Sequence, residues 1–292
     1  SANGSISLDV NGGTPNFVFT WNPATGTNGP TATNLIAGTY NITVEDAYGC
    51  SDDIQVVLTE PSGMNLTVTI NNHVNCFGES NGSAVASVTG GSLPYSYTWN
   101  YDNSHQAFNN NLPAGTWSVT VFDANGCQVF EQFTITEPNA LSLQFSNVQN
   151  VSCAGMADGA AIAIVTGGTG PYSYDWDDPG NSTQATASNL PAGMYHVTVT
   201  DAHGCTITNQ ILITEPVALQ VAATSQPVQC GITLGSASAQ VSGGTMPYSY
   251  SWTGGSTSQQ ALGLISGTYT VLVSDANSCT ASAVVYVGMQ GT

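Results

Sequence analysis

The chain has 292 residues, with 18 acidic side chains and no Lys or Arg, so its formal charge at neutral pH is −18. Nucleic acids and anionic membrane surfaces are bound through cationic side chains, so we expect neither class of partner. Chemistry that needs an ammonium or guanidinium group, such as a P-loop lysine, a Schiff base or an arginine finger, is excluded as well.

The composition nevertheless predicts a folded chain. Hydrophobic residues make up 41% of the sequence and charged residues only 6%, which is unlike the charge-rich, apolar-poor chains that stay disordered. No run of about 18 apolar residues occurs, and no basic-then-apolar segment opens the chain. We therefore expect a mature, soluble piece whose export signal and anchor lie elsewhere.

Internal repetition organises the sequence. Seven cysteines form two series, and successive members of each series are 74–78 residues apart. This period predicts four copies of one module, the first of them truncated. The predicted repeats are residues 1–61, 62–138, 139–216 and 217–292.

Each repeat contains a Gly-Gly turn that leads into three aromatic residues spaced two positions apart. Alternate residues of a strand share one face, so the three rings lie together. Such a face could stack sugars, but its recurrence in all four repeats favours packing in a core. The tryptophans that we expect in the cores are Trp21, Trp99, Trp176 and Trp252.

A second alternating strand follows in each repeat and ends in an Asp-x-x-Gly turn, with Ser278 replacing the glycine in the fourth repeat. No D-x-D-x-D ladder surrounds the turn acids, so hydrogen bonds from backbone amides are favoured over calcium binding. The turn acids are Asp46, Asp123, Asp201 and Asp275. Thr-Glu-Pro closes the first three repeats, and its proline marks a strand end and a junction.

These patterns predict an all-β fold. No stretch of ten or more residues has apolar positions at helical spacing, whereas short alternating strands recur between Gly and Pro turns. We expect a tandem array of four Ig-like β-sandwich modules of about 75 residues each.

The cysteine pattern favours disulfides over a zinc site, because the cysteines recur regularly without CxxC pairs. Two pairings satisfy the count. The same-repeat pairing, which we favour, joins Cys76 to Cys127, Cys153 to Cys205 and Cys230 to Cys279, and leaves Cys50 unpaired or paired with a cysteine upstream. The adjacent-repeat pairing joins Cys50 to Cys76, Cys127 to Cys153 and Cys205 to Cys230.

The segments from Gly90 to Trp99 and from Asn111 to Cys127 resemble the SprB-type repeat of giant surface adhesins in gliding Bacteroidota, which runs G-G-x-x-P-Y-x-Y-x-W and then N-L-P-A-G-T-Y-x-V-x-V-x-D-A-N-G-C. The resemblance covers nearly the whole chain. It implies a secreted bacterial cell-surface protein, exported by a type IX system, that works in adhesion or gliding motility. The fourth repeat departs from this pattern, since it ends Val287-Gly288-Met289-Gln290 in place of Thr-Glu-Pro.

Few residues suggest a site. Asp175, Asp177 and Asp178 form the densest acidic group and are the better candidates for calcium, against the alternative of solvated loop acids. Tyr101, His105 and Phe108 occur in a long loop unique to the second repeat and could serve as a ligand platform. The four histidines share no spacing typical of a metal site, and no nucleophile has the context of a catalytic triad, so we expect no enzyme and no cofactor beyond calcium.

Two functions follow from this sequence. The first is a structural or adhesive repeat region of a secreted cell-surface adhesin or extracellular filament, acting as a stiff, disulfide-stabilised shaft whose partners are neighbouring repeats or identical chains. The alternative is an array of modules that bind a polysaccharide or a cell surface through variable loops with the help of calcium. Sameness of the repeats favours the first, and the variable loops keep the second open.

Overall fold

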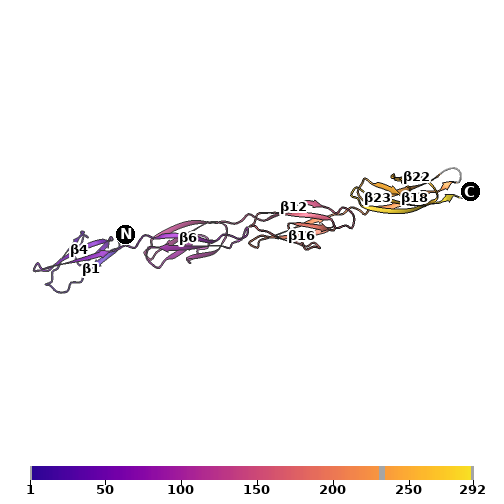
Figure 1. The fold of residues 1–292 in the computed structure, drawn as a ribbon. Helices are drawn as coiled ribbons and strands as arrows, with labels where there is room; N and C mark the ends of the chain where they lie inside the picture. Colours follow the sequence, from indigo (N-terminus) through magenta and orange to yellow (C-terminus); the bar gives the residue numbers. More distant parts are fainter. Residues whose placement is uncertain (1, 230–233, 291–292) are drawn as a thin grey trace. The chain divides into compact units, whose positions relative to one another are not determined.

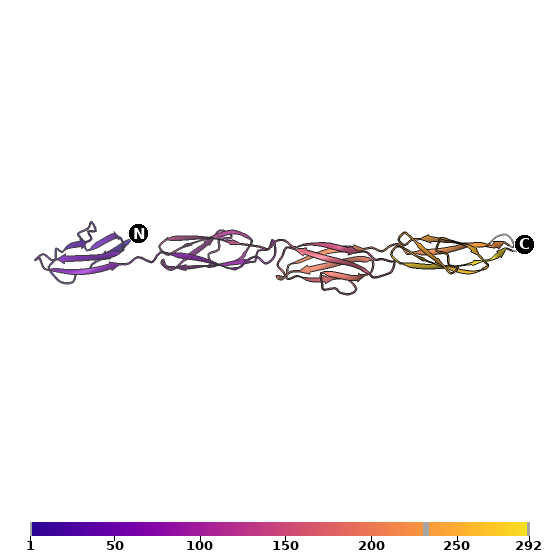
Figure 2. The ribbon, with the colours of Figure 1, turned by 45° about the horizontal axis from the view of Figure 1, so that its top comes forward.

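The computed structural model describes residues 2–229 and 234–290. Every regular element in these ranges is a β-strand, so the all-β prediction is confirmed. Within the same ranges, no helix is long and apolar enough to cross a membrane. Figure 1 shows the strands packed as pairs of facing sheets, and Figure 2 shows the same layers after a 45° turn.

Contacts divide the chain into two units. Unit 1 contains Ser1–Asn71, Ser83–Asn110 and Thr116–Thr134, and unit 2 contains Asn72–Gly82, Asn111–Gly115 and Ile135–Thr292. The division passes through the second repeat, so the predicted repeat boundaries stay predictions. We describe each unit by itself and keep the predicted repeats as names for the segments.

The third repeat, in unit 2, shows the full sandwich. One sheet has the order β12 (Ser142–Gln149), β13 (Gly159–Thr166), β15 (Thr186–Leu190), and the other has the order β14 (Ser173–Trp176), β16 (Gly193–Thr200), β17 (Thr206–Ile213). All neighbours are antiparallel. Alternate residues of both sheets meet in a core around Trp176 and Tyr195. The sheets approach closely at Gly159, where a Cβ atom would lie 2.7 Å from the Ile213 side chain.

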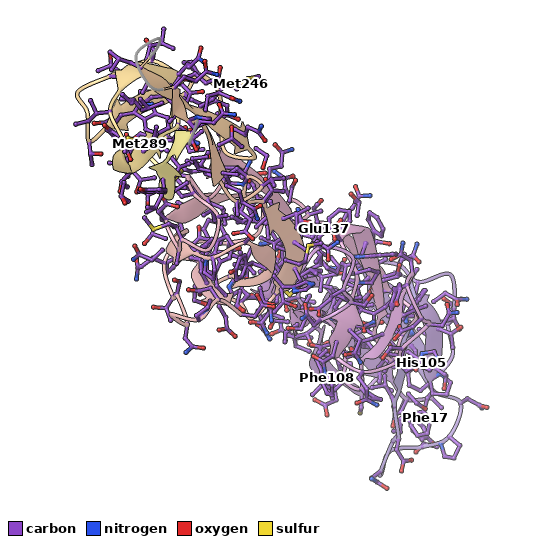
Figure 3. The ribbon with its side chains drawn as sticks, turned by 90° about the vertical axis from the view of Figure 1, so that its right-hand side faces the viewer. Phe17, His105, Phe108, Glu137, Met246 and Met289 are labelled. Atoms are coloured by element: carbon purple, nitrogen blue, oxygen red, sulfur yellow. A yellow bond between two sulfur atoms is a disulfide. The ribbon has the colours of Figure 1, made fainter. Side chains whose placement is uncertain are left out.

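The fourth repeat, also in unit 2, repeats this plan. Its sheets have the orders β18 (Gln220–Gln226), β20 (Gly235–Ser242), β22 (Gln260–Leu264) and β21 (Ser249–Trp252), β23 (Gly267–Ser274), β24 (Thr280–Val287). The closing segment that replaces Thr-Glu-Pro forms the short strand β25 (Met289–Gln290). It pairs in parallel with β19 (Val228–Gln229). Met246 and Met289, both labelled in Figure 3, are exposed.

The second repeat lies mostly in unit 1. Its sheets have the orders β6 (Asn65–Asn72), β7 (Gly82–Thr89), β9 (Phe108–Leu112) and β8 (Ser96–Trp99), β10 (Gly115–Phe122), β11 (Gln128–Ile135). Trp99 is buried and packs edge to face against Phe133, with the ring centroids 5.7 Å apart.

The first repeat differs from the others. It has the three-stranded sheet β2 (Val18–Asn22), β4 (Gly38–Glu45), β5 (Ser51–Leu58), but its other sheet has two strands only, β1 (Gly4–Ser7) and β3 (Thr31–Leu35). No described strand occupies the position that β12 and β18 take in the later repeats. Its core surrounds Trp21 and Tyr40.

The recurring tryptophans have a second task besides filling the cores. Each is buried, and its indole N–H donates to a backbone carbonyl in the loop after the aromatic strand. The pairs are Trp21 with Gly29 (3.1 Å), Trp99 with Gln106 (2.8 Å), Trp176 with Gln184 (3.0 Å) and Trp252 with Ser258 (3.0 Å). A buried indole N–H needs such a partner, so each ring also fixes the return of the chain to the opposite sheet.

Candidate functional site at the disulfide junctions

The Asp-x-x-Gly-Cys turn is the first part of each junction. In the fourth repeat, one carboxylate oxygen of Asp275 accepts from the amides of Asn277 and Cys279, both at 2.9 Å, and the other accepts from the amide of Thr245 at 2.8 Å. These bonds close the hairpin and hold the cysteine at its end. The turn acids thus bind backbone amides, as the sequence predicts.

The same contacts explain the titration of the turn acids. Burial alone would raise the pKa of Asp275, but the hydrogen bonds from Thr245, Cys279 and Asn277 outweigh it and hold the pKa below the ordinary value of 3.8. For Asp46 the hydrogen bond from Thr14 is the largest cause, and it lowers the pKa in the same direction. The charged form of the acid is therefore part of the folded turn.

The second part of a junction is the Cys-x-Gly loop that follows the first strand of a repeat. In the third repeat, the amide of Met156 donates to the carbonyl of Cys153 at 3.0 Å. The amide of Gly155 donates to the Glu215 carboxylate at 2.6 Å. In the second repeat the amide of Gly78 donates in the same way to Glu137, labelled in Figure 3, also at 2.6 Å. The glutamate of Thr-Glu-Pro therefore holds the loop that carries the cysteine.

Two disulfides join a loop of one repeat to the turn of the next. Cys76 bonds Cys205 and Cys153 bonds Cys279, at sequence separations of 129 and 126 residues. The Cα atoms are 5.7 Å apart in both. Beside the second bond, the side-chain amide of Asn277 donates to the Ser152 carbonyl at 2.9 Å. Both bonds lie within unit 2. The first links the second repeat to the third, and the second links the third repeat to the fourth.

The favoured same-repeat pairing is wrong. Cys205 bonds Cys76 and not Cys153, and Cys279 bonds Cys153 and not Cys230. In the third repeat the turn acid Asp201 accepts from the Thr169 amide, and the neighbouring Gly168 amide donates to Asn139, just before β12. The Cys153 loop follows the other end of β12. An eight-residue strand is about 26 Å long, so β12 keeps Cys153 far from Cys205. A disulfide between these two cysteines would need Cα atoms within about 7 Å.

The adjacent-repeat pairing is contradicted as well, because Cys76, Cys153 and Cys205 each bond a cysteine other than the one that it assigns. In both disulfides of unit 2, the loop of one repeat meets the turn of the next. Cys127, which we expected to be bonded, is free and exposed, as is Cys50. Cys230 lies outside the described residues.

The acidic group of the third repeat is not brought together. Asp178 is buried, and its carboxylate accepts from the amides of Gly180 (3.0 Å) and Ser182 (2.7 Å), so it holds its own loop. Asp177 binds His196, and Asp175 lies exposed on β14. In residues 2–229 and 234–290, no group of three or more His, Cys, Asp or Glu side chains is placed to hold a metal ion.

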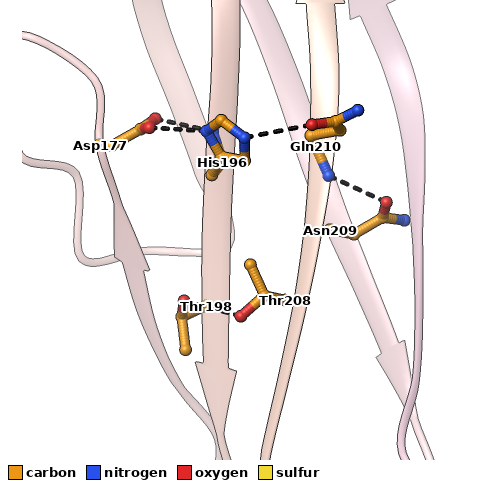
Figure 4. A network of polar contacts seen from close by, with 6 residues as sticks. All are labelled: Asp177, His196, Thr198, Thr208, Asn209 and Gln210. Atoms are coloured by element: carbon orange, nitrogen blue, oxygen red, sulfur yellow. Dashed lines mark hydrogen bonds and ion pairs between the residues drawn. The ribbon is translucent and has the colours of Figure 1, made fainter.

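His196 is the centre of a surface network on the third repeat (Figure 4). Its ring Nδ1 lies 2.8 Å from Asp177 Oδ2, and Nε2 lies 3.1 Å from Gln210 Oε1. The His196 amide donates to Asp177 at 2.7 Å and is the largest cause of the lowered pKa of that carboxyl. The network joins the loop after β14 to β16 and β17, and it is about half exposed.

The three candidate residues in the loop of the second repeat have different environments. His105 Nδ1 lies 2.9 Å from the Tyr97 carbonyl, so this ring is tied to the aromatic strand. Tyr101 is 40% exposed and stacks edge to face on Trp117 at 4.8 Å, and Phe108 is 49% exposed. His105 and Phe108 are labelled in Figure 3.

The sequence reasoning missed the glutamate of Thr-Glu-Pro as a functional residue. Its signal was present, because the acid recurs before the proline in three repeats. The pattern by itself accounts only for the proline, because the role of the glutamate depends on its position next to the Cys-x-Gly loop.

The repeats of this chain are similar to a known family of repeats. The model of the SprB repeat matches four segments of the chain, residues 1–26, 67–103, 145–181 and 222–257. No curated protein sequence matches the chain.

Three of the solved structures that match the chain have low sequence identity and low TM-scores. The eight N-terminal Ig domains of Down Syndrome Cell Adhesion Molecule are 10% identical, with 99% of this chain and 58% of that chain covered and a TM-score of 0.29. Ig domains 1–5 of Sidekick-1 are 11% identical, with 99% and 77% covered and a TM-score of 0.34. The BSP domain of a biofilm associated protein is 9% identical, with 88% and 75% covered and a TM-score of 0.27.

Proposed function

Since the chain carries four SprB repeats, we propose that it is a structural, non-enzymatic region of a secreted bacterial cell-surface adhesin or extracellular filament, and that it acts as a stiff shaft. The observation that carries this proposal is the pair of disulfides that join successive repeats. A shaft must transmit force from module to module, and a covalent bond between two modules keeps them joined when the chain is pulled.

The two disulfides overlap in sequence, which strengthens the argument. Cys153 lies between Cys76 and Cys205, so the loops closed by the two bonds share residues. The shortest covalent path from Cys76 to Cys279 runs through both bonds and the segment between Cys153 and Cys205. A pulling force on the unfolded chain is therefore carried by the two bonds and by that segment, which is most of the third repeat, and residues 77–152 and 206–278 are shielded from it.

The disulfides and the composition support an extracellular location. Disulfides persist in oxidising compartments and are rare in the cytosol. A surface with 18 acidic residues and no Lys or Arg repels similar surfaces, which keeps a repetitive chain soluble. Neighbouring repeats, and identical chains in a filament, are the partners that this role requires.

Force spectroscopy on the full chain tests the shaft. In the oxidised chain only about 50 of the about 200 residues between Cys76 and Cys279 can extend, at about 3.5 Å per residue. Reduction with dithiothreitol should release the remaining residues and lengthen the fully stretched chain by about 500 Å. The doubly substituted chain Cys76→Ser/Cys153→Ser should show the long extension without reductant. Equal extension of the oxidised and reduced chains would refute the proposal.

A second candidate, loop-mediated binding of a polysaccharide, is favoured by one observation. Tyr101 is partly exposed and packs on Trp117, a tryptophan that only the second repeat has at that position. Aromatic faces stack on sugar rings. Titration calorimetry with bacterial and plant oligosaccharides, comparing the chain with Tyr101→Ala, would detect this activity, and calcium can be added as a variable.

A further inference from the structure

His73 accepts a hydrogen bond in a place where the third repeat has an asparagine. It directly follows β6, and its ring Nδ1 accepts from the backbone amide of Thr136 at 3.1 Å. Asn150 directly follows β12, and its Oδ1 accepts from the backbone amide of Thr214 at 2.9 Å. Each acceptor lies three residues before the loop cysteine of its repeat. The same structural contact is therefore made by two different side chains in the two repeats.

The segment bound by this histidine holds the loop that carries Cys76. Thr136 is followed by Glu137, whose carboxylate accepts from the Gly78 amide of the loop at 2.6 Å. Cys76 bonds Cys205 of the third repeat. All of these residues belong to unit 2. A change at Thr136 therefore reaches the disulfide loop through one residue, Glu137.

The module does not need the side-chain acceptor to fold. The fourth repeat has Pro227 at this position, and proline offers no side-chain acceptor. The neighbouring backbone contact is nevertheless kept, because the Val228 amide donates to the Gly288 carbonyl at 2.9 Å, as the Val74 amide donates to the Thr136 carbonyl at 3.0 Å. Loss of the side-chain contact should therefore loosen the segment without unfolding the repeat.

Only an uncharged imidazole can make the contact at His73. Its Nδ1 accepts a hydrogen bond when it carries no proton, whereas both ring nitrogens of an imidazolium are donors. Histidine is the side chain that changes charge between about pH 5 and pH 8, and an asparagine amide does not titrate. His73 is exposed, so its ring exchanges protons with the solvent. In acid the Thr136 amide therefore loses its acceptor, and the Thr214 amide keeps Asn150.

The ionisable side chains on the elements next to His73 are mostly acidic. Glu137 is the nearest to the contact in sequence, because it directly follows Thr136. The others are Glu131 on β11, five residues before Thr136 and about 16 Å away along the strand, Glu79 in the loop of Cys76, and Asp201 and His203 in the turn that carries Cys205. The chain has no Lys or Arg, so the carboxylates attract an imidazolium at this place without competition from those cations.

We propose that His73 makes the link between the second and third repeats sensitive to pH. At neutral pH the uncharged ring accepts from Thr136, and Glu137 holds the cysteine loop. In acid the ring is protonated, releases the Thr136 amide and, as a donor, competes with the Gly78 amide for the Glu137 carboxylate. The loop is then held less firmly, and its disulfide is open to reductants. The link between the third and fourth repeats does not respond, because Asn150 stays an acceptor.

This proposal goes beyond the shaft function and does not depend on it, because the contacts belong to the junction whatever the chain supports. In a shaft, the device would let acid surroundings weaken one link while the other stays closed. The extension of the reduced chain tests the shaft, whereas the pH dependence of two bonds within one chain tests the histidine. The two proposals therefore fail separately.

The first test is amide hydrogen exchange of the full chain at pH 7.5 and pH 5.5, followed by NMR and corrected for the intrinsic exchange rates. Protection of the Thr136 amide, relative to that of the Thr214 amide, should fall about fivefold at pH 5.5, as for the loss of one hydrogen bond. His73→Asn gives the second repeat the acceptor of the third and should show no such fall. Unchanged relative protection in the native chain, or the same fall in His73→Asn, would overturn the proposal.

The second test is reduction of the two disulfides by tris(2-carboxyethyl)phosphine. The phosphine becomes a phosphine oxide with an oxygen atom from water, and each disulfide becomes two thiols. The rate for Cys76–Cys205 divided by the rate for Cys153–Cys279 cancels the pH dependence of the reagent. This ratio, measured by alkylation, peptic digestion and mass spectrometry, should rise about fivefold from pH 7.5 to pH 5.5. His73→Asn should keep the low ratio at both pH values, and His73→Ala should show the high ratio at both.

A further variant separates the two histidines of this junction. His203 lies in the turn that carries Cys205, and the fourth repeat has Asn277 at the same position, so His203→Asn is a matched substitution. This variant should keep the rise of the ratio in acid. A rise that is lost in His203→Asn and kept in His73→Asn would assign the response to the turn and overturn the proposal. A ratio that does not change with pH in the native chain would overturn it as well.

Discussion

Glu215 accepts a hydrogen bond of 2.6 Å from the amide of Gly155, two residues after the bonded Cys153. The glutamate that ends one repeat thus holds the loop that is cross-linked to the next. One hydrogen bond within the third repeat therefore positions the cysteine that links this repeat to the fourth.

Removal of this contact should loosen the disulfide. We expect Glu215→Ala to speed reduction of the Cys153–Cys279 bond by dithiothreitol about fivefold, which corresponds to a loss of about 1 kcal/mol from one hydrogen bond. Glu131→Ala, an exposed position on β11, serves as the matched control and should leave the rate unchanged. An unaltered rate in Glu215→Ala would mean that the bond is protected by burial and not by the loop.

Acid should destabilise the turns. The pKa values of Asp201 and Asp275 are lower in the folded chain than the ordinary value of 3.8, so their charged forms stabilise the fold above that pH. This stability is lost as the pH falls from about 3.8 through the folded pKa values. The thermal midpoint should therefore fall more steeply between pH 4 and pH 2 in the native chain than in Asp275→Asn. Asp175→Asn, on an exposed strand face, should follow the native curve.

The tryptophan cores should dominate the stability of each repeat. Trp176 is buried and its indole N–H binds the Gln184 carbonyl, so Trp176→Ala should cost about 3–5 kcal/mol in urea unfolding. Trp176→Phe keeps most of the ring but loses the hydrogen bond, and it should cost about 1–2 kcal/mol. Phe130→Ala, at a side chain that is 61% exposed, should change the free energy of unfolding by less than about 0.5 kcal/mol.

Salt should stabilise the chain. The acidic side chains repel one another, and no Lys or Arg compensates them, so screening lowers the free energy of the compact state. The thermal midpoint should rise between 10 mM and 500 mM sodium chloride. Calcium compared at equal ionic strength measures specific binding, and an extra calcium response that vanishes in Asp177→Asn would place a site in the loop of the third repeat. A midpoint that does not change with sodium chloride would show that charge repulsion is not limiting.

Much of the fold could be predicted from the sequence, because the same pattern of residues recurs in each repeat. The alternation around Tyr195, Val197 and Val199 specifies a strand with one buried face, and the recurring Trp at the end of the aromatic run specifies a core position. Local hydrogen bonds make the Asp-x-x-Gly turn equally readable, since Asp275 and its donors Asn277 and Cys279 are close in the chain. These features depend on neighbours within a few residues or on a period of two.

The pairing of the cysteines was decided by the tertiary structure alone. The cysteine spacing is compatible with several pairings. The repeat period shows which cysteines occupy equivalent positions, but it does not show which ends of neighbouring modules are in contact. Cys153 and Cys279 come together because β12 carries the loop to the far end of its own sandwich, where the turn of the next repeat lies. The role of Glu215 follows from that same arrangement in space, which no local pattern of residues contains.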